Sequence, residues 1–183
     1  MNPYAHFLEG NDPLKLITAT PKRIDALVKG LTPAQMKKRV NKDKWSIYEI
    51  VQHLADCELM FASRCRLIAF DDHPHLQPFD QDRWAAGKAL ERESVEEAIN
   101  RFNALRRSQI ALYKASSPEA RARTGHHPER GEVSMAITFE TCAGHDVNHL
   151  RQIEALRAAV APAKKSAPKQ HAKAHAKKAK RKK

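Results

Sequence analysis

Residues 45–58 read WSIYEIVQHLADCE and give the clearest indication of how this 183-residue chain folds. Ser46, with Glu49 three residues later, forms a capping box, in which the two side chains satisfy backbone N–H groups at the start of a helix. Apolar residues then recur close to every 3.6 positions, which is the spacing of one helical face. They are Ile47, Ile50, Leu54, Cys57, Phe61 and Ile68. A long amphipathic helix is therefore predicted from Ser46 to about Phe70.

Upstream of this helix the sequence predicts a first helix and a short helical turn. The pair at 12–13, Asp-Pro, is typical of a helix start, because proline is well tolerated at the first helical position. The Thr-Pro pair at 20–21 repeats that signal, so a break in the first helix is expected there. Gly30 is a good helix stop. A further Thr-Pro pair at 32–33 predicts the short turn.

Two more helices are predicted downstream, and each has its own boundary signals. Ser94 and Glu97 form a second capping box, and the helix that they start is expected to reach about Ala115. The last helix is predicted over about 135–161, and Pro162 ends it because proline cannot continue a helix.

The connections between these helices are polar and long. Residues 71–93 contain two X-Pro pairs and are expected to hold a short helical turn near 81–86, whereas residues 116–134 are rich in Gly, Pro and charge. Long loops in compact domains are often functional. No alternating strand pattern of useful length and no internal repeat is found. The fold class is therefore predicted as all-α, a helical bundle.

The positive charge of the chain is concentrated at its C-terminal end. Residues 162–183 hold ten Lys or Arg and no acid, so the net charge of +12, less these ten, leaves +2 for residues 1–161. Without large apolar residues this segment cannot offset the entropy of ordering, and a disordered Lys-rich tail is predicted. Such a tail attracts nucleic acid without sequence specificity, or serves only to solubilise the domain formed by residues 1–161.

Hydrophobic runs and cysteines indicate a cytoplasmic protein. No apolar run approaches the roughly 20 residues that a membrane span requires, and the N-terminus lacks the pattern of a secretion signal. Cys57, Cys65 and Cys142 are odd in number and irregular in spacing, which does not suggest a disulfide framework. All three lie in helical apolar patterns, so buried free thiols are expected.

Three histidines are the candidate metal ligands. His145 and His149 are four residues apart, so on a helix they lie on one face, about one turn apart. That face also carries Cys142 and Ile153 and should pack inward. His53 lies in the inward stripe of the helix that starts at Ser46, so three imidazoles from two inward faces could converge. Unpaired buried imidazoles would be costly, which favours a metal site over three separate core histidines.

Three neutral imidazoles suit Zn, Ni or Fe(II). Three protein ligands leave a coordination position for water or substrate, which is typical of a catalytic rather than a structural site. Asp56 and Asp146 are candidates to orient the histidine rings, although either fits an ordinary helix surface equally well. Exposed loop positions are expected for His73 and His75, beside prolines, and for His126 and His127, in the loop before the last helix, although these four could also line the mouth of a pocket. No phosphate-binding loop, GxSxG, CxxC or HExxH motif competes with this site.

These features resemble the DinB-like superfamily of metal-binding four-helix bundles. The matching segments are WSIYEIVQHLADCE at 45–58, FDQDRWAA at 79–86, TGHHPERGEVSM at 124–135 and GHDVNHLRQIEALR at 144–157. The resemblance covers most of residues 1–157 and excludes the tail. It implies an antiparallel bundle of up-up-down-down topology and a metal triad at His53, His145 and His149. Family members are often described as metal-dependent hydrolases, some characterised relatives are thiol S-transferases, and many form homodimers.

Three hypotheses about function follow. In the first, a divalent metal ion held by the three histidines activates a water or a low-molecular-weight thiol, giving a hydrolase or a thiol S-transferase that acts on a small molecule. The substrate would reach the site between the helix ends, near residues 71–93 and 116–134. In the second, the bundle is a non-catalytic metal-binding scaffold whose basic tail binds nucleic acid. In the third, the metal is only structural.

Overall fold

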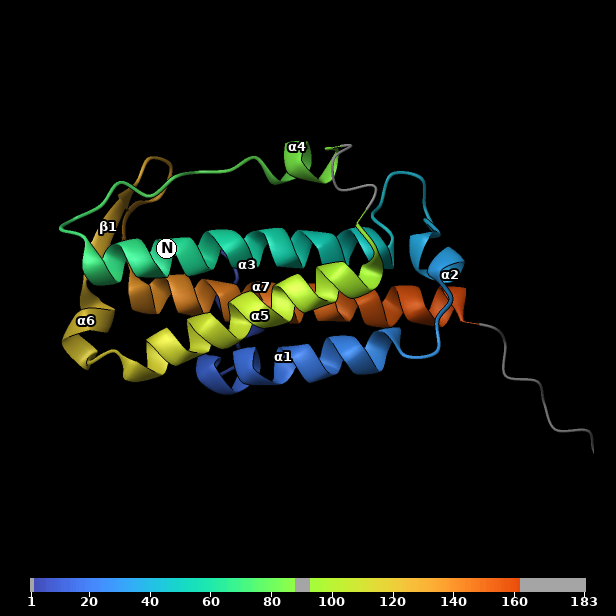
Figure 1. Ribbon diagram of the computed structural model, residues 1–183, viewed down its shortest axis with the longest axis horizontal. Coiled ribbons are helices and arrows are strands. Elements are labelled where there is room, and N and C mark those ends of the chain that lie inside the picture. The colour runs from blue at the N-terminus through green and yellow to red at the C-terminus, as the bar shows by residue number, and fades with distance from the viewer. Residues whose placement is uncertain (1, 88–92, 162–183) are drawn as a thin grey trace, which may run out of the picture.

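The computed structural model describes residues 2–87 and 93–161, and its four long helices lie side by side in a bundle (Figure 1). These helices are α1 (Pro13–Val28), α3 (Ile47–Phe70), α5 (Val95–Ala115) and α7 (Met135–Val160). Short elements join them: η1 (Ala5–Phe7), α2 (Pro33–Lys37), α4 (Gln81–Ala85), α6 (Pro118–Ala122), β1 (Thr124–His127) and β2 (Gly131–Ser134). The all-α four-helix bundle is confirmed. The predicted tail, 162–183, lies outside the described residues.

The helix starts lie where the capping signals place them. Ser46 and Ser94 each accept a hydrogen bond from the backbone of the glutamate three residues on, and each glutamate accepts one in return, so both capping boxes are complete. Thr32 forms a third capping box with Gln35 at the start of α2. The predicted turn near 81–86 is α4, which begins after the N-cap Asp80.

The directions of the helices differ from the up-up-down-down order that the resemblance implies. Paired contacts advance together along α1 and α7, and also along α3 and α5, so each of these pairs is parallel. The contacts are Thr20 with Asp146, Arg23 with Glu154, Asp56 with Arg101, and Arg66 with Ser108. Contacts between α3 and α7 run in opposite directions, His53 with His149 and Phe61 with His145, so the order is up-down-down-up. Residues 71–87 carry the chain back along α3 (Figure 1).

Helix α1 continues through Pro21, where a break was predicted. Proline has no N–H, so the carbonyl of Ile17, four residues earlier, loses its usual helical partner. In the structure that carbonyl accepts a hydrogen bond from Nη1 of Arg106 at 3.2 Å. A side chain from α5 thus replaces the missing bond, and the helix remains unbroken.

A short β-hairpin precedes α7 where only a connection was predicted. Strands β1 and β2 are antiparallel, with Gly125 opposite Val133 and a turn that ends at Gly131, whose φ is +69°. Sequence patterning misses the hairpin because each strand has four residues, with two buried positions in β1 and one in β2. The hairpin lies at one end of the bundle, next to α6 (Figure 1). A Cβ on Gly125 would lie 2.8 Å from the Pro74 carbonyl oxygen, so glycine permits this close packing.

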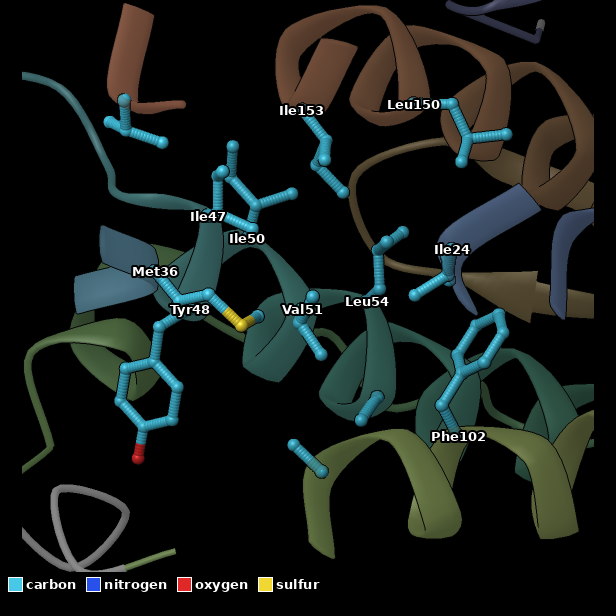
Figure 2. Close-up of a cluster of buried hydrophobic side chains, with 13 residues drawn as sticks. Ile24, Met36, Ile47, Tyr48, Ile50, Val51, Leu54, Phe102, Leu150 and Ile153 are labelled. Carbon is cyan, nitrogen blue, oxygen red and sulfur yellow. The ribbon is translucent and has the colours of Figure 1, made fainter. Parts of the chain in front are cut away.

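The main hydrophobic core lies between the helices at the end of the bundle where α3 begins. Figure 2 shows side chains from α1, α2, α3, α5 and α7 meeting there, including Ile24, Met36, Leu54, Phe102 and Ile153. The three cysteines are buried and free, as predicted. Within the described residues, no helix has both the length and the hydrophobicity to cross a membrane.

One ion-pair network is buried at the centre of the bundle. The Arg106 side chain is 1% exposed, and its Nη2 donates to Oε2 of Glu58 on α3 at 2.7 Å. Its Nη1 donates to Oδ2 of Asp146 on α7 at 2.5 Å. The same Asp146 oxygen accepts from Oγ1 of Thr20 on α1 at 2.7 Å. The network therefore joins all four long helices.

We expect Arg106→Ala to lower the free energy of unfolding by about 3–5 kcal/mol, because it leaves two buried carboxylates without their cation. Urea unfolding followed by circular dichroism measures this loss. Arg107→Ala, at the adjacent exposed position, is the control and should stay within about 0.5 kcal/mol of the parent. Similar stability losses for the two variants would contradict a central role for the network.

Candidate metal centre

His53, His145 and His149 come together in the interior, as their positions on two inward faces predict. Each is buried, with at most 5% of its surface exposed. The ring centroids of His53 and His145 are 5.1 Å apart, and those of His149 lie 4.7 Å from His53 and 4.4 Å from His145. Helix α3 supplies the first histidine and α7 supplies the other two.

The nitrogen atoms of two of the three histidines are spaced as ligands of a small cation would be. Nε2 of His53 and Nε2 of His145 are 3.0 Å apart. Two ligand nitrogens on a tetrahedral zinc ion, each about 2.0–2.1 Å from it, would be about 3.3 Å apart. Nδ1 of His145 is buried and has no hydrogen-bond partner within the part of the chain described. The spacing of the His53 and His145 nitrogens therefore fits a divalent metal ion.

Burial keeps the three imidazoles neutral. Burial, together with the smaller effect of neighbouring His149, lowers the pKa of His53 to about 3. Burial is also the main cause that lowers the pKa of His145 and of His149, and the hydrogen bond to Gln152 opposes it for His149. Neutral imidazole is the form that binds a metal.

Cys57 also lies at this centre and was expected only as a core thiol. Its Sγ is 3.4 Å from Nε2 of His53, one helical turn earlier on α3. His53, Cys57 and His145 each offer a ligand atom, and these three atoms lie within 4.8 Å of one another. The i, i+4 spacing of His53 and Cys57 is the signal that sequence reasoning passed over.

The ring of His149 is oriented by Gln152, not by either of the aspartates considered from the sequence. Its Nδ1 lies 3.0 Å from Oε1 of Gln152. An amide oxygen can only accept, so Nδ1 carries the proton and Nε2 keeps its lone pair. Asp56 instead pairs with Arg101, and Asp146 pairs with Arg106. Both carboxylates are held by buried or half-buried cations, which explains why they do not face the histidine nitrogens.

Trp45 covers one side of the centre and also lines a pocket. Its ring lies 4.7 Å from that of His53 and stacks on that of His149 at 6.3 Å, centroid to centroid. The capping box that follows Trp45 fixes this position. A pocket of about 550 Å³ lies beside it, within the size range of small-molecule sites. Its lining includes Asp43, Lys44, Trp45, Ile50, Asp82, His149, Gln152 and Leu156.

This pocket only partly matches the predicted approach to the site. Asp82 of α4 belongs to the segment 71–93, as expected, whereas residues 43–45 come from a connection that the sequence did not single out. The hairpin segment 116–134 does not line this pocket. It lines a second, smaller cavity at the other end of the α3–α7 seam.

Two aromatic side chains enclose His145. The Tyr4 ring meets it edge-on at 5.3 Å, and the Phe61 ring does so at 5.8 Å, centroid to centroid. The N-terminal segment can lie this close because α7 carries Gly144, where a Cβ would be 2.4 Å from the Tyr4 carbonyl oxygen. The glycine before His145 therefore lets the first residues cover the site.

The remaining candidate histidines lie apart from the centre, around the hairpin. His73 and His126 are exposed or partly exposed and both contact the Glu132 carboxylate, at 2.8 and 3.3 Å. The ring of His75 is next to that of His126. His127, expected to be exposed, is buried, because the hairpin turns it toward α3 and α7.

The fold and the site together define a helical-bundle protein with a buried His and Cys cluster that could bind a metal ion beside a small-molecule pocket. The DinB superfamily model matches residues 16–153, and the chain belongs to this superfamily.

Curated relatives and solved structures agree with this assignment. Two proteins of Oceanobacillus iheyensis, both named "Putative metal-dependent hydrolase", are 27% identical over 141 residues (77% of this chain, 81% of the relative) and 25% identical over 146 residues (80% and 84%). YfiT from Bacillus subtilis, described as "a probable metal-dependent hydrolase with an unusual four-helix bundle topology", is 19% identical. It superposes with a TM-score of 0.73 over 79% of this chain and 83% of YfiT. The four-helix bundle protein TT2238 gives 0.57, at 22% identity, over 78% and 96%.

The depressed pKa values predict that the metal-free protein loses stability below about pH 6.5. Unfolding frees the histidines to take up protons at their ordinary pKa, whereas His53 in the fold stays neutral until about pH 3. Each such histidine lowers the free energy of unfolding by about 1.4 kcal/mol per pH unit within this window. Urea unfolding in the presence of a chelator, from neutral pH to about pH 5, measures the slope.

His53→Gln should make that slope shallower, since it removes one of the groups that titrate. His126→Gln, at the hairpin surface, should leave it unchanged. A parent protein whose stability is flat across the window would be inconsistent with neutral, buried imidazoles.

Proposed function

We propose that the chain is a divalent-metal-dependent enzyme that acts on a small molecule through an open centre formed by His53, His145 and His149. The observation that carries this proposal is the convergence of three neutral, buried imidazoles beside a pocket of about 550 Å³ that His149 itself lines. A histidine that faces both the cluster and the pocket offers a bound ion access to a substrate. Zn, Ni and Fe(II) all suit this donor set.

An ion held by three protein ligands supplies Lewis-acid chemistry and lowers the pKa of a water or thiol bound to it. The chain's own residues prepare the site. Gln152 holds the His149 ring with Nε2 unprotonated, and Trp45 stacks over that ring and keeps solvent from one side. Asp43, Lys44 and Asp82 place charges at the pocket rim, where they can orient a polar substrate.

Two reaction types fit this arrangement: hydrolysis, with water as the nucleophile, and transfer to a low-molecular-weight thiol. The names of the relatives favour hydrolysis. No contact within the described residues singles out a thiol cofactor, so hydrolysis is the function proposed first. A role of the basic tail in nucleic-acid binding stays a prediction.

Metal content tests the ligands. Protein purified without a His-tag should contain a divalent ion, and His149→Ala should weaken its binding by more than about a hundredfold. Gln152→Ala should weaken it by about 10–100-fold, the usual effect of removing the partner that orients a histidine ligand. Elemental analysis and competition with a chromophoric chelator measure both. His126→Ala is the matched control, and equal metal content in it and in His149→Ala would refute the triad.

Cobalt substitution tests whether the centre is open. We expect Cys57→Ser to retain the ion, and the cobalt-loaded parent to lack sulfur-to-cobalt charge-transfer absorption, since His149 lines the 550 Å³ pocket whereas Cys57 is not among its lining residues. Such an absorption, lost in Cys57→Ser and kept in Cys65→Ser, would instead make the thiol a ligand. The centre would then be closed, and the hydrolase proposal would fail.

Activity is tested by screening the metal-loaded protein against ester and amide substrates and, in parallel, for conjugation of small thiols to electrophiles. We expect hydrolysis that disappears in His149→Ala and after chelation, and returns when metal is restored. Trp45→Ala should reduce kcat/KM and leave metal content unchanged. Conjugation without hydrolysis would point to the transferase.

A further inference from the structure

A second cavity lies at the other end of the α3–α7 seam, under the hairpin. Phe61 and Arg64 of α3 line it together with His127 of β1 and Arg130 of the hairpin turn. Phe61 is also the ring that packs against His145. The cavity is therefore separated from the metal centre by one aromatic side chain. Thr141, which also lines it, precedes His145 by four residues, or about 6 Å along the helix axis.

Positive charge gathers around this cavity without an ion-pair partner. Arg64 is 7% exposed, and its Nη2 donates to the Gln77 carbonyl at 2.7 Å, but its Nε is buried and has no partner in the described chain. Among the ion pairs within the described residues, none involves Arg64 or Arg130. Buried polar groups are normally satisfied, so an unpaired arginine N–H that lines a cavity points to a missing acceptor.

The pKa shifts of Arg64 and His127 reflect the short distances between the positively charged groups around the cavity. Burial and the charge of Arg130 lower the pKa of Arg64, and burial, Arg64 and Arg130 lower the pKa of His127. The charge of Glu129 acts in the opposite direction on both, but that carboxylate is exposed on the turn. Cys57 and Cys65 also face Arg64, and their thiols are neutral at neutral pH because burial raises their pKa.

His127 offers a further donor. Its Nδ1 accepts a hydrogen bond from the backbone N–H of Glu129 at 3.2 Å, so the neutral ring carries its proton on Nε2. The cavity thus combines an unpaired guanidinium N–H, an imidazole N–H and the exposed Arg130. A planar carboxylate suits such a set, because arginine binds carboxylates through a fork of parallel N–H donors.

We propose that this cavity is a subsite for a carboxylate group of the small molecule on which the neighbouring centre acts. The substrate class is then a carboxylate-bearing molecule, whose anionic end binds Arg64, His127 and Arg130. The free space is about 10 Å³, roughly one water molecule, so Arg130 must move aside for the carboxylate. Its exposure on the turn permits this. That the bound molecule is the substrate rests on the proposed function, whereas binding of the carboxylate does not need the metal.

Arginine side-chain N–H signals in ¹H–¹⁵N NMR spectra of the full-length, metal-free protein test this proposal directly. Arg64→Lys identifies the Nε–H signal of Arg64. We expect sodium acetate to shift that signal saturably over the millimolar range, because the orphaned N–H gains a charged acceptor. Acetamide, the neutral isostere, and sodium chloride at equal ionic strength should not. No saturable shift with acetate, or the same shift with acetamide or chloride, would overturn the proposal.

Two variants sharpen the test without disturbing the fold. Arg130→Gln, at an exposed turn position, should weaken acetate binding by about tenfold or more, the effect of losing one charged hydrogen bond. Arg107→Gln removes a positive charge at an exposed position on α5 and should leave binding unchanged. Equal affinities in the two variants would overturn the subsite. His149→Ala should still bind acetate, so failure of the metal proposal and failure of this one are distinguishable.

Discussion

The buried guanidinium of Arg106 is the constraint around which the bundle is organised. A cation in the interior must be neutralised, and here Glu58 on α3 and Asp146 on α7 do so, with the Ile17 carbonyl of α1 as a further acceptor. Each partner lies on a different helix, so the network fixes the position of each helix along the bundle axis relative to the others. It also explains how α1 passes through Pro21 without a break, since the carbonyl freed by the proline is the one that Arg106 binds.

The same network sets the metal centre. Asp146 directly precedes Val147 and follows His145, and Glu58 follows Cys57, so the residues that anchor the ion pair are sequence neighbours of the cluster. Locking Glu58 against Asp146 through Arg106 brings the imidazole of α3 opposite the two of α7. The bundle therefore has two adjacent polar layers in its interior, one of paired charges and the other of neutral imidazoles that could hold a cation. Their closeness gives the centre the rigid support that ligand geometry requires.

Short elements, not the long helices, determine what reaches this centre. The connection before Ser46 and the helix α4 shape the pocket beside His149, and the N-terminal segment covers His145 through Tyr4. The hairpin closes the opposite end of the seam and places His127 and Arg130 over Arg64. A rigid scaffold with functional groups on its connections is a common arrangement, because loops vary without cost to the core. The two ends of the seam differ in chemistry: one is a large mixed pocket, the other a small cationic cavity.

Local signals in the sequence were enough to predict the helices and the two ligand-bearing faces. The capping boxes at Ser46 and Ser94 and the spacing of His145 and His149 depend only on residues a few positions apart, so they could be recognised without the fold. Non-local contacts could not. The continuity of α1 at Pro21 needs Arg106, the helix order needs the path of residues 71–87, and the hairpin is stabilised by packing on α3 and α7. Likewise, only the tertiary structure brings Cys57 to His145 and leaves Arg64 facing a cavity, because each depends on segments far apart in sequence meeting in space. The pairs His149 with Gln152 and His53 with Cys57 are three and four residues apart on one helix, so their spacing was available in the sequence.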